Sequence, residues 1–253
     1  MVTIKVAETE QGARWLTEGF EYFRRDPGIW VVMAVIFLLF FIVLSLVKGL
    51  GGLVMTLLTP VLVGGVILGC RDLDQGKRLT VSHLFAGFSK NTGQLILLGL
   101  FHYIGMVIIM IISLLIVTPF MGGMPFFMQF MHTMEGGNMD VAASMYLGML
   151  LVVLVGMLFY VPVIMALWFA PVLVVLDDES AVNALINSFK GCLQNIVPFL
   201  IYGLLGTALA IVASIPFFLG WLVLMPMIMA SIYLGYKDIF VTSPVDTLAH
   251  DAS

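Results

Sequence analysis

Charged residues are what this sequence has least of. Only 10% of its 253 residues are Asp, Glu, Lys or Arg, whereas 61% are hydrophobic and the mean hydropathy is +1.12. Apolar residues in this proportion cannot be hidden inside a soluble particle of this size. The composition excludes an ordinary soluble domain and predicts that lipid surrounds most of the chain. The net charge of −4 is not gathered in one field, so nucleic acid is not an expected partner.

Cysteine is also scarce, and the familiar catalytic motifs are missing. The two cysteines, Cys70 and Cys192, form no CxxC pair and have no neighbouring His, which excludes a disulfide framework. We expect both to be reduced, small apolar residues near the cytoplasmic border. The sequence contains no HExxH, GxSxG or phosphate-binding glycine loop. We therefore expect no catalytic centre, no metal and no cofactor.

Long uncharged stretches fill most of the chain. A helix needs about 20 apolar residues to cross the hydrocarbon core. Divided at Gly and Pro, the stretches predict six spans, at 28–47, 50–70, 94–118, 146–175, 195–215 and 218–236. The residues before the first span carry Arg14, Arg24 and Arg25 along a helical pattern, and the apolar run after them is too long for a signal peptide. We expect the first span to be retained.

One apolar pattern, with spacing i, i+3, i+4, i+7, recurs ahead of successive pairs of spans. Its members are Leu16, Gly19, Phe20 and Phe23, then Val81, Leu84, Phe85 and Phe88, then Val182, Leu185, Ile186 and Phe189. Each set predicts an amphipathic helix on the membrane surface. The expected fold is all-α, a single polytopic integral membrane helix bundle with six transmembrane helices in three tandem repeats of an amphipathic helix plus two spans.

The expected repeats cover residues 12–72, 80–176 and 180–240. The middle repeat is longer than the others because it contains an external Met-rich insertion at 119–144. The tail, 241–253, is expected to be disordered.

Basic residues give the orientation. Of the eleven Lys and Arg residues, all but Lys48 fall on the face that both termini share. The positive-inside rule therefore places both termini in the cytoplasm. Basic and amphipathic aromatic side chains near an anionic leaflet also attract lipid headgroups. The candidates for these contacts are Arg14, Trp15, Arg24, Arg25, Lys90 and Lys190.

A proline lies inside the second span of each repeat, at Pro60, Pro171 and Pro226. Proline removes a helix hydrogen bond and bends the helix, which membrane helices tolerate when neighbours satisfy the freed carbonyl. The pattern favours three kinks that shape the bundle. The alternative is a set of half-helices around a solute site at the membrane midplane, as in transporters.

Three segments carry a resemblance to a known family: Glu18 to Pro27, Leu68 to Gly76, and His83 to Phe88. They resemble an uncharacterised integral membrane family of proteobacterial inner membranes. The second half, from Trp168 to Phe240, is also similar to the YciC-type proteins and to the membrane domain fused to some glycerophosphodiester phosphodiesterases. The resemblance implies a bacterial inner-membrane protein without an established activity. It supplies no catalytic residue, because the soluble phosphodiesterase domain with its acidic metal ligands is absent.

Two features could carry chemistry. His102 is the one titratable residue deep within a span, and the lack of an acidic partner favours an interhelical hydrogen bond over a proton relay or a ligand role. The insertion gathers side chains that suit a soft metal such as Cu(I). They are Met121, Met124, Met128, Met131, His132, Met134 and Met139. Several also follow a helical stripe with Phe127, which favours an interfacial helix covering the bundle.

The absence of charge within the spans and of any catalytic cluster favours a non-enzymatic role. We expect a membrane-embedded scaffold, assembly factor or lipid-organising protein, with membrane lipids, other inner-membrane proteins or a second copy of the chain as partners. The alternative is a permease or facilitator for a neutral or weakly polar solute. It is suggested by the span prolines and by Thr59, Ser214 and Ser231.

Overall fold

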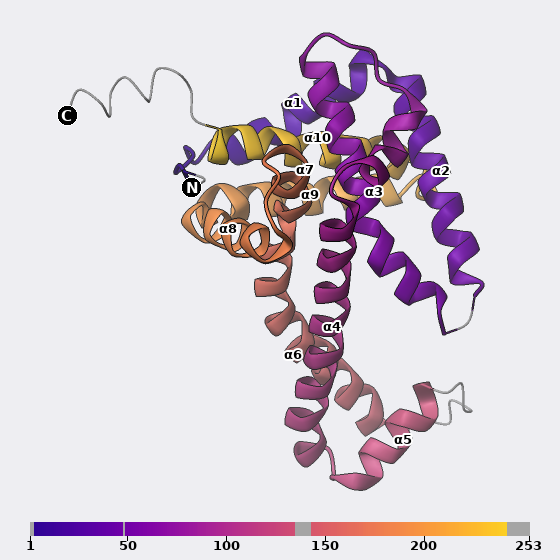
Figure 1. Ribbon diagram of the computed structural model, residues 1–253. Coiled ribbons are helices and arrows are strands. Elements are labelled where there is room, and N and C mark those ends of the chain that lie inside the picture. Colours follow the sequence, from indigo (N-terminus) through magenta and orange to yellow (C-terminus); the bar gives the residue numbers. More distant parts are fainter. Residues whose placement is uncertain (1–2, 48, 135–142, 242–253) are drawn as a thin grey trace, which may run out of the picture. The chain divides into compact units, whose positions relative to one another are not determined.

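The computed structural model describes residues 3–47, 49–134 and 143–241, and within these ranges it contains helices and no strand (Figure 1). Six segments are long and apolar enough to cross a membrane. They are α2 (Pro27–Ser45), α3 (Gly51–Asp74), α4 (Thr92–Phe120), Tyr146–Leu176, α9 (Ile196–Ser214) and α10 (Trp221–Phe240). The fourth segment combines α6 (Ala143–Trp168) with α7 (Ala170–Leu176). The all-α class and the six predicted spans are confirmed.

The remaining helices are shorter. They are α1 (Gln11–Arg25), η1 (Val81–Ser89), α5 (Met124–Met134) and α8 (Ala181–Gln194). Three of them, α1, η1 and α8, precede pairs of spans where amphipathic helices were predicted. The second is a 3₁₀ helix rather than an α-helix. The tandem repeat itself stays a prediction. Disorder was expected for the tail, 241–253, and its residues from 242 onward lie outside the described ranges.

The contacts divide the chain into two compact units. Unit 1 comprises Met1–Leu100 and Met165–Ser253, and unit 2 comprises Phe101–Ile164. The boundaries fall inside α4 and α6, so each of these helices contributes residues to both units.

In unit 1, α1 packs against α9 and α10. Its buried face consists of Gly12, Trp15, Leu16, Gly19, Tyr22 and Phe23. A Cβ atom on Gly19 would lie 2.6 Å from the carbonyl oxygen of Met227, so the helices approach too closely for any side chain there. The apolar face that was predicted to enter the lipid surface is thus covered by protein, and that prediction is wrong for α1. Phe20 alone of the predicted stripe is exposed.

Part of the apolar stripe predicted for α8, by contrast, is exposed, as a helix on the membrane surface requires. The buried face of α8 consists of Ala181, Ala184, Ser188, Gly191 and Cys192. The larger side chains of Val182 and Ile186 are exposed instead. Small residues face the neighbouring helices because they allow close approach, which is how helices pack when lipid offers no hydrophobic driving force.

The three prolines at which kinks were predicted lie at two different kinds of helix position. Pro60 and Pro226 lie inside α3 and α10, and both are buried; the kinks expected there stay a prediction. Pro171 instead lies in the first turn of α7, after a break in the helix between Trp168 and Ala170. Proline is well accommodated in a first turn, where its missing N–H would be unpaired anyway.

A serine from α8 holds this break open. The Ser188 hydroxyl oxygen accepts a hydrogen bond of 2.9 Å from the Phe169 N–H, and the hydroxyl donates one of 2.8 Å to the Met165 carbonyl. In a continuous helix these two backbone groups would bond each other. The hydroxyl is therefore inserted into the helical hydrogen-bond ladder, with both backbone groups satisfied.

In unit 2, α4 and α6 lie side by side and antiparallel (Figure 1), with Gly105 opposite Val163 and Gly156 opposite Ser113. The loop end of this pair is packed by α5. Its core consists of Leu114, Val117, Phe126, Phe130 and Val152.

The phenylalanines of α5, rather than its methionines, thus face α4 and α6. Met124 and Met128 are 67% and 63% exposed, so the methionine stripe is not the buried face of α5. Met139, and the side chain of Met134, lie outside the described part of the chain.

Candidate functional site

The polar side chains of unit 1 gather where its spans end, and we call this set the polar rim. Its members are Tyr22, Asp72, Asp74, His83, Asp177, Tyr233, Tyr236, Lys237 and Asp238. They come from α1, α3, η1, the α7–α8 turn and α10.

Asp74, at the end of α3, joins three helices of the rim. One carboxylate oxygen accepts a hydrogen bond of 2.8 Å from the Tyr22 hydroxyl of α1. The other accepts from the Tyr233 hydroxyl at 3.2 Å and from the Lys237 ammonium at 2.7 Å, both on α10. Burial, and next the hydrogen bond to Asp74, raises the pKa of Tyr22 above its usual range, so its hydroxyl stays a neutral donor.

Trp15 is part of the same packing and not of the lipid-facing surface. Its side chain is 2% exposed, and its indole N–H donates a 2.7 Å hydrogen bond to Asp238 of α10. The prediction that Trp15 contacts lipid headgroups is therefore wrong. A tryptophan at this sequence position is equally suited to a buried site in which its N–H finds a carboxylate.

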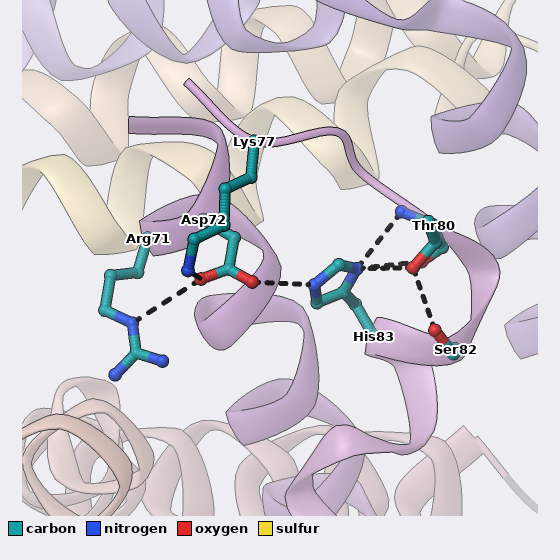
Figure 2. Close-up of polar contacts among 6 residues, drawn as sticks. All are labelled: Arg71, Asp72, Lys77, Thr80, Ser82 and His83. Carbon is teal, nitrogen blue, oxygen red and sulfur yellow. Dashed lines mark hydrogen bonds and ion pairs between the residues drawn. The ribbon is translucent and has the colours of Figure 1, made fainter. Parts of the chain in front are cut away.

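A second cluster fixes η1 to the end of α3 (Figure 2). Asp72 accepts hydrogen bonds from Lys77 at 3.0 Å and from His83 Nε2 at 3.3 Å. The other ring nitrogen of His83, Nδ1, accepts from the Thr80 backbone N–H at 3.1 Å. With Nδ1 accepting from this N–H, Nε2 is the nitrogen that would carry the proton donated to Asp72. His83 and Thr80 thereby form a capping box at the start of η1.

The acidic turn between α7 and α8 is held by partners from other helices. Asp177 accepts a 2.8 Å hydrogen bond from Tyr236, and burial raises the pKa of its carboxyl group. Asp178 accepts from the Asn91 amide at 2.7 Å and pairs with Lys90 at 3.4 Å. The Asn91 hydrogen bond, and next Lys90, lowers the pKa of Asp178. Lys90 therefore already pairs with a carboxylate, and its contact with lipid headgroups stays a prediction.

The other predicted headgroup contacts are exposed. Arg14 lies 3.9 Å from Glu10, and Arg24 lies 3.1 Å from Glu21, in pairs that are open to solvent. Exposed pairs of this kind contribute little to stability. Arg25 covers the Tyr22 ring at 4.5 Å, and Lys190 is an exposed residue of α8. These cations are accessible to lipid headgroups, and the contacts themselves stay a prediction.

An anchor for the N-terminal segment was missed from the sequence. Asn195, between α8 and α9, is fully buried; its side-chain oxygen accepts from the Ala7 N–H at 2.6 Å. Its amide donates to the carbonyls of Lys5 and Gly191 at 3.0 and 2.9 Å. An asparagine at the start of an apolar span was the available signal, but only the fold brings the N-terminus to it.

The polar pair of unit 2 is formed by His102 of α4 and Tyr160 of α6. His102 Nε2 and the Tyr160 hydroxyl are 2.9 Å apart, and the two rings stack with their centroids 5.9 Å apart. The predicted interhelical hydrogen bond of His102 is confirmed. Another polar pair lies in unit 1, where the hydroxyl groups of Tyr202 and Ser231 are hydrogen-bonded at 2.7 Å.

Within residues 3–47, 49–134 and 143–241, no three His, Cys, Asp or Glu side chains gather as metal ligands. Of the side chains named for a soft-metal site, those of Met121, Met124, Met128, Met131 and His132 are described by the structure, and those of Met134 and Met139 are not, so this site stays a prediction.

A comparison with curated sequences gives the family. The chain is 31% identical over 207 residues to a probable inner membrane protein of Burkholderia thailandensis, a match that covers 80% of this chain and 74% of the relative. The chain belongs to the family of this inner-membrane protein. The predicted membrane location is thereby confirmed at this level. No family model and no solved structure matches the chain, so the finer resemblance to YciC-type proteins and to the phosphodiesterase membrane domain stays a prediction.

Proposed function

We propose that this protein is a non-enzymatic, lipid-organising scaffold of the inner membrane, with both termini in the cytoplasm. The observation that carries the proposal is the distribution of polar groups in unit 1. The acidic and aromatic polar groups of the rim are used to hold α1, α3, η1 and α10 to one another. Arg14, Arg24 and Lys190 remain exposed along α1 and α8.

The cavities of unit 1 support a lipid-facing role over solute passage. A groove of about 820 Å³ lies between α1, α9 and α10, lined by apolar residues except Thr17 and Glu21. A smaller pocket beside Trp30 and Pro226 is lined by apolar side chains alone. Such surfaces suit acyl chains, whereas a path for a polar solute needs hydrogen-bonding groups along its walls.

Lipid capture tests the proposal directly. The full chain is purified in detergent from membranes of mixed phosphatidylethanolamine and phosphatidylglycerol, and the retained lipids are measured by mass spectrometry. Retention of phosphatidylglycerol above its share in the membrane is the expected result. Each basic residue near an anionic surface contributes about 1 kcal/mol, so the triple variant R14Q/R24Q/K190Q should lose most of this enrichment. The control E18Q changes an exposed acidic residue on α1 and should not lower it.

Two outcomes would contradict the proposal. One is equal lipid retention by the wild type and the triple variant. The other is glycerol flux in reconstituted vesicles above that of protein-free vesicles, with loss of the flux in Pro60→Ala or Pro226→Ala. The second outcome would establish the facilitator that the sequence left as the alternative.

Orientation can be tested on the same protein. Cys70 and Cys192 are buried, and burial raises the pKa of the Cys192 thiol to about 12, so both should be silent to maleimide. A cysteine introduced by Glu18→Cys on the exposed face of α1 should react with a membrane-impermeant maleimide only after the inner membrane is opened. Labelling in intact spheroplasts would place the N-terminus outside.

A further inference from the structure

The polar pair of unit 2 stands at one end of an apolar groove. The groove has a volume of about 430 Å³ and lies between α4 and α6. Its lining includes Met106, Met110, Ser113, Gly156, Met157 and Tyr160, and the other lining side chains are apolar. Gly156 and Ser113 make room for it, since a Cβ atom on Gly156 would reach only ordinary contact with the Ser113 hydroxyl, at 3.4 Å.

The His102–Tyr160 pair can offer either a donor or an acceptor to an occupant of this groove. If His102 Nε2 carries a proton and donates it to the Tyr160 oxygen, the Tyr160 hydroxyl is released to donate to a carbonyl. If Nε2 is the unprotonated nitrogen, Tyr160 donates to it, and the Tyr160 oxygen accepts from a hydroxyl group. The 2.9 Å separation fits both arrangements. The site therefore matches a neutral ligand that exists in carbonyl and hydroxyl forms.

The depth of the pair excludes ordinary phospholipid headgroups. His102 lies eight positions after residue 94, where the predicted span begins, which is about 12 Å along a helix axis. This distance is more than a third of the ~30 Å hydrocarbon core. Phosphates, amines and ester carbonyls of phospholipids lie at the interface. A ligand polar atom at this depth must belong to a molecule that is itself dissolved among the acyl chains.

The lining also excludes a charged ligand, because no Asp, Glu, Lys or Arg side chain lines the groove and an uncompensated charge is costly at this depth. The methionine side chains are flexible and polarisable and adapt well to a flat ring. We propose that the groove between α4 and α6 binds an isoprenoid quinone or its quinol, with a ring oxygen hydrogen-bonded to Tyr160. This site goes beyond the lipid-organising role proposed for unit 1 and uses none of its residues.

The test is saturable binding of decylubiquinone. The full chain is placed in nanodiscs of phosphatidylethanolamine, and bound decylubiquinone is measured by its absorbance after filtration, with empty nanodiscs as background. Phospholipid is in large excess in the nanodisc, so saturable binding above background reports a preference over acyl chains. Loss of one hydrogen bond, about 1 kcal/mol, predicts about fivefold weaker binding for Tyr160→Phe. Gly156→Leu fills the groove and should abolish saturable binding.

Tyr103→Phe is the matched control, since Tyr103 is the neighbour of His102, is exposed, and does not line the groove. It should bind as the wild type does. Circular dichroism of Gly156→Leu establishes that the helices remain, and Tyr160→Phe keeps the test decisive should Gly156→Leu not fold. The proposal is overturned if the wild type shows no saturable binding, or if Tyr160→Phe binds the probe as tightly as Tyr103→Phe. Because the residues tested by lipid capture lie in unit 1, failure of one proposal is distinguishable from failure of the other.

Discussion

Removal of the Ser188 hydroxyl should destabilise the protein well beyond what a serine-to-alanine change normally costs. Ser188 is fully buried, and its hydroxyl satisfies the N–H of Phe169 and the carbonyl of Met165 at the break between α6 and α7. In Ser188→Ala, the buried Phe169 N–H has lost its partner. The Met165 carbonyl keeps a weaker contact of 3.4 Å from the Cys192 thiol.

The magnitude follows from these two groups. An unsatisfied buried donor costs about 1–3 kcal/mol, and the carbonyl adds less because Cys192 still reaches it. The helix could recover the loss by closing the direct hydrogen bond from Phe169 to Met165. This closure is opposed by Pro171, whose ring would clash with the carbonyl of Leu167 in a continuous helix. We therefore expect the free energy of unfolding to fall by about 2 kcal/mol.

The measurement is reversible unfolding in mixed detergent micelles, followed by circular dichroism. The control is Ser45→Ala at the end of α2, where an exposed hydroxyl donates to the Ile42 carbonyl. An exposed substitution of this kind should change the free energy of unfolding by less than about 0.5 kcal/mol. If Ser188→Ala is as stable as Ser45→Ala, the hydroxyl does not hold the break and the argument is refuted.

Three further predictions concern unit 1. Gly19→Val should lower the free energy of unfolding by more than about 2 kcal/mol, because its Cβ would meet a backbone carbonyl of α10. Gly28→Ala, which has open space around it, should not lower it when measured in the same unfolding assay. Asn195→Ala should release the N-terminal segment, so trypsin should cut after Lys5 faster than in the wild type, and an unchanged rate would show that other contacts hold the segment. Burial raises the pKa of Asp177, so ionising it costs stability as the pH rises from about 4 through its elevated pKa. Asp177→Asn should therefore match the wild type near pH 4 and be more stable at pH 7, and a less stable variant at pH 7 would contradict this.

The residues that the sequence singled out show why part of the candidate site could not be predicted. Arg14 and Arg24 are exposed where their sequence positions suggested, because a charge beside an apolar run has few places to go other than the interface. The same reasoning placed Trp15 at the interface, but Trp15 is buried. Whether an indole faces headgroups or a carboxylate depends on which helix covers it. His102 was recognised by its depth alone, but the hydrogen bond to Tyr160 depends on the antiparallel register of α4 and α6.

The sequence by itself determined the class of the fold and its six spans, because crossing a bilayer requires long uncharged helices and little else. It also determined where short helices precede the spans. Only the tertiary structure decided which faces of these helices are buried. Apolar residues in a membrane are at no disadvantage on the outside, so Val182 and Ile186 can face outward while small residues pack inward. The helix break held by Ser188 was likewise invisible in sequence, since its partners lie on another helix, 19 and 23 residues away.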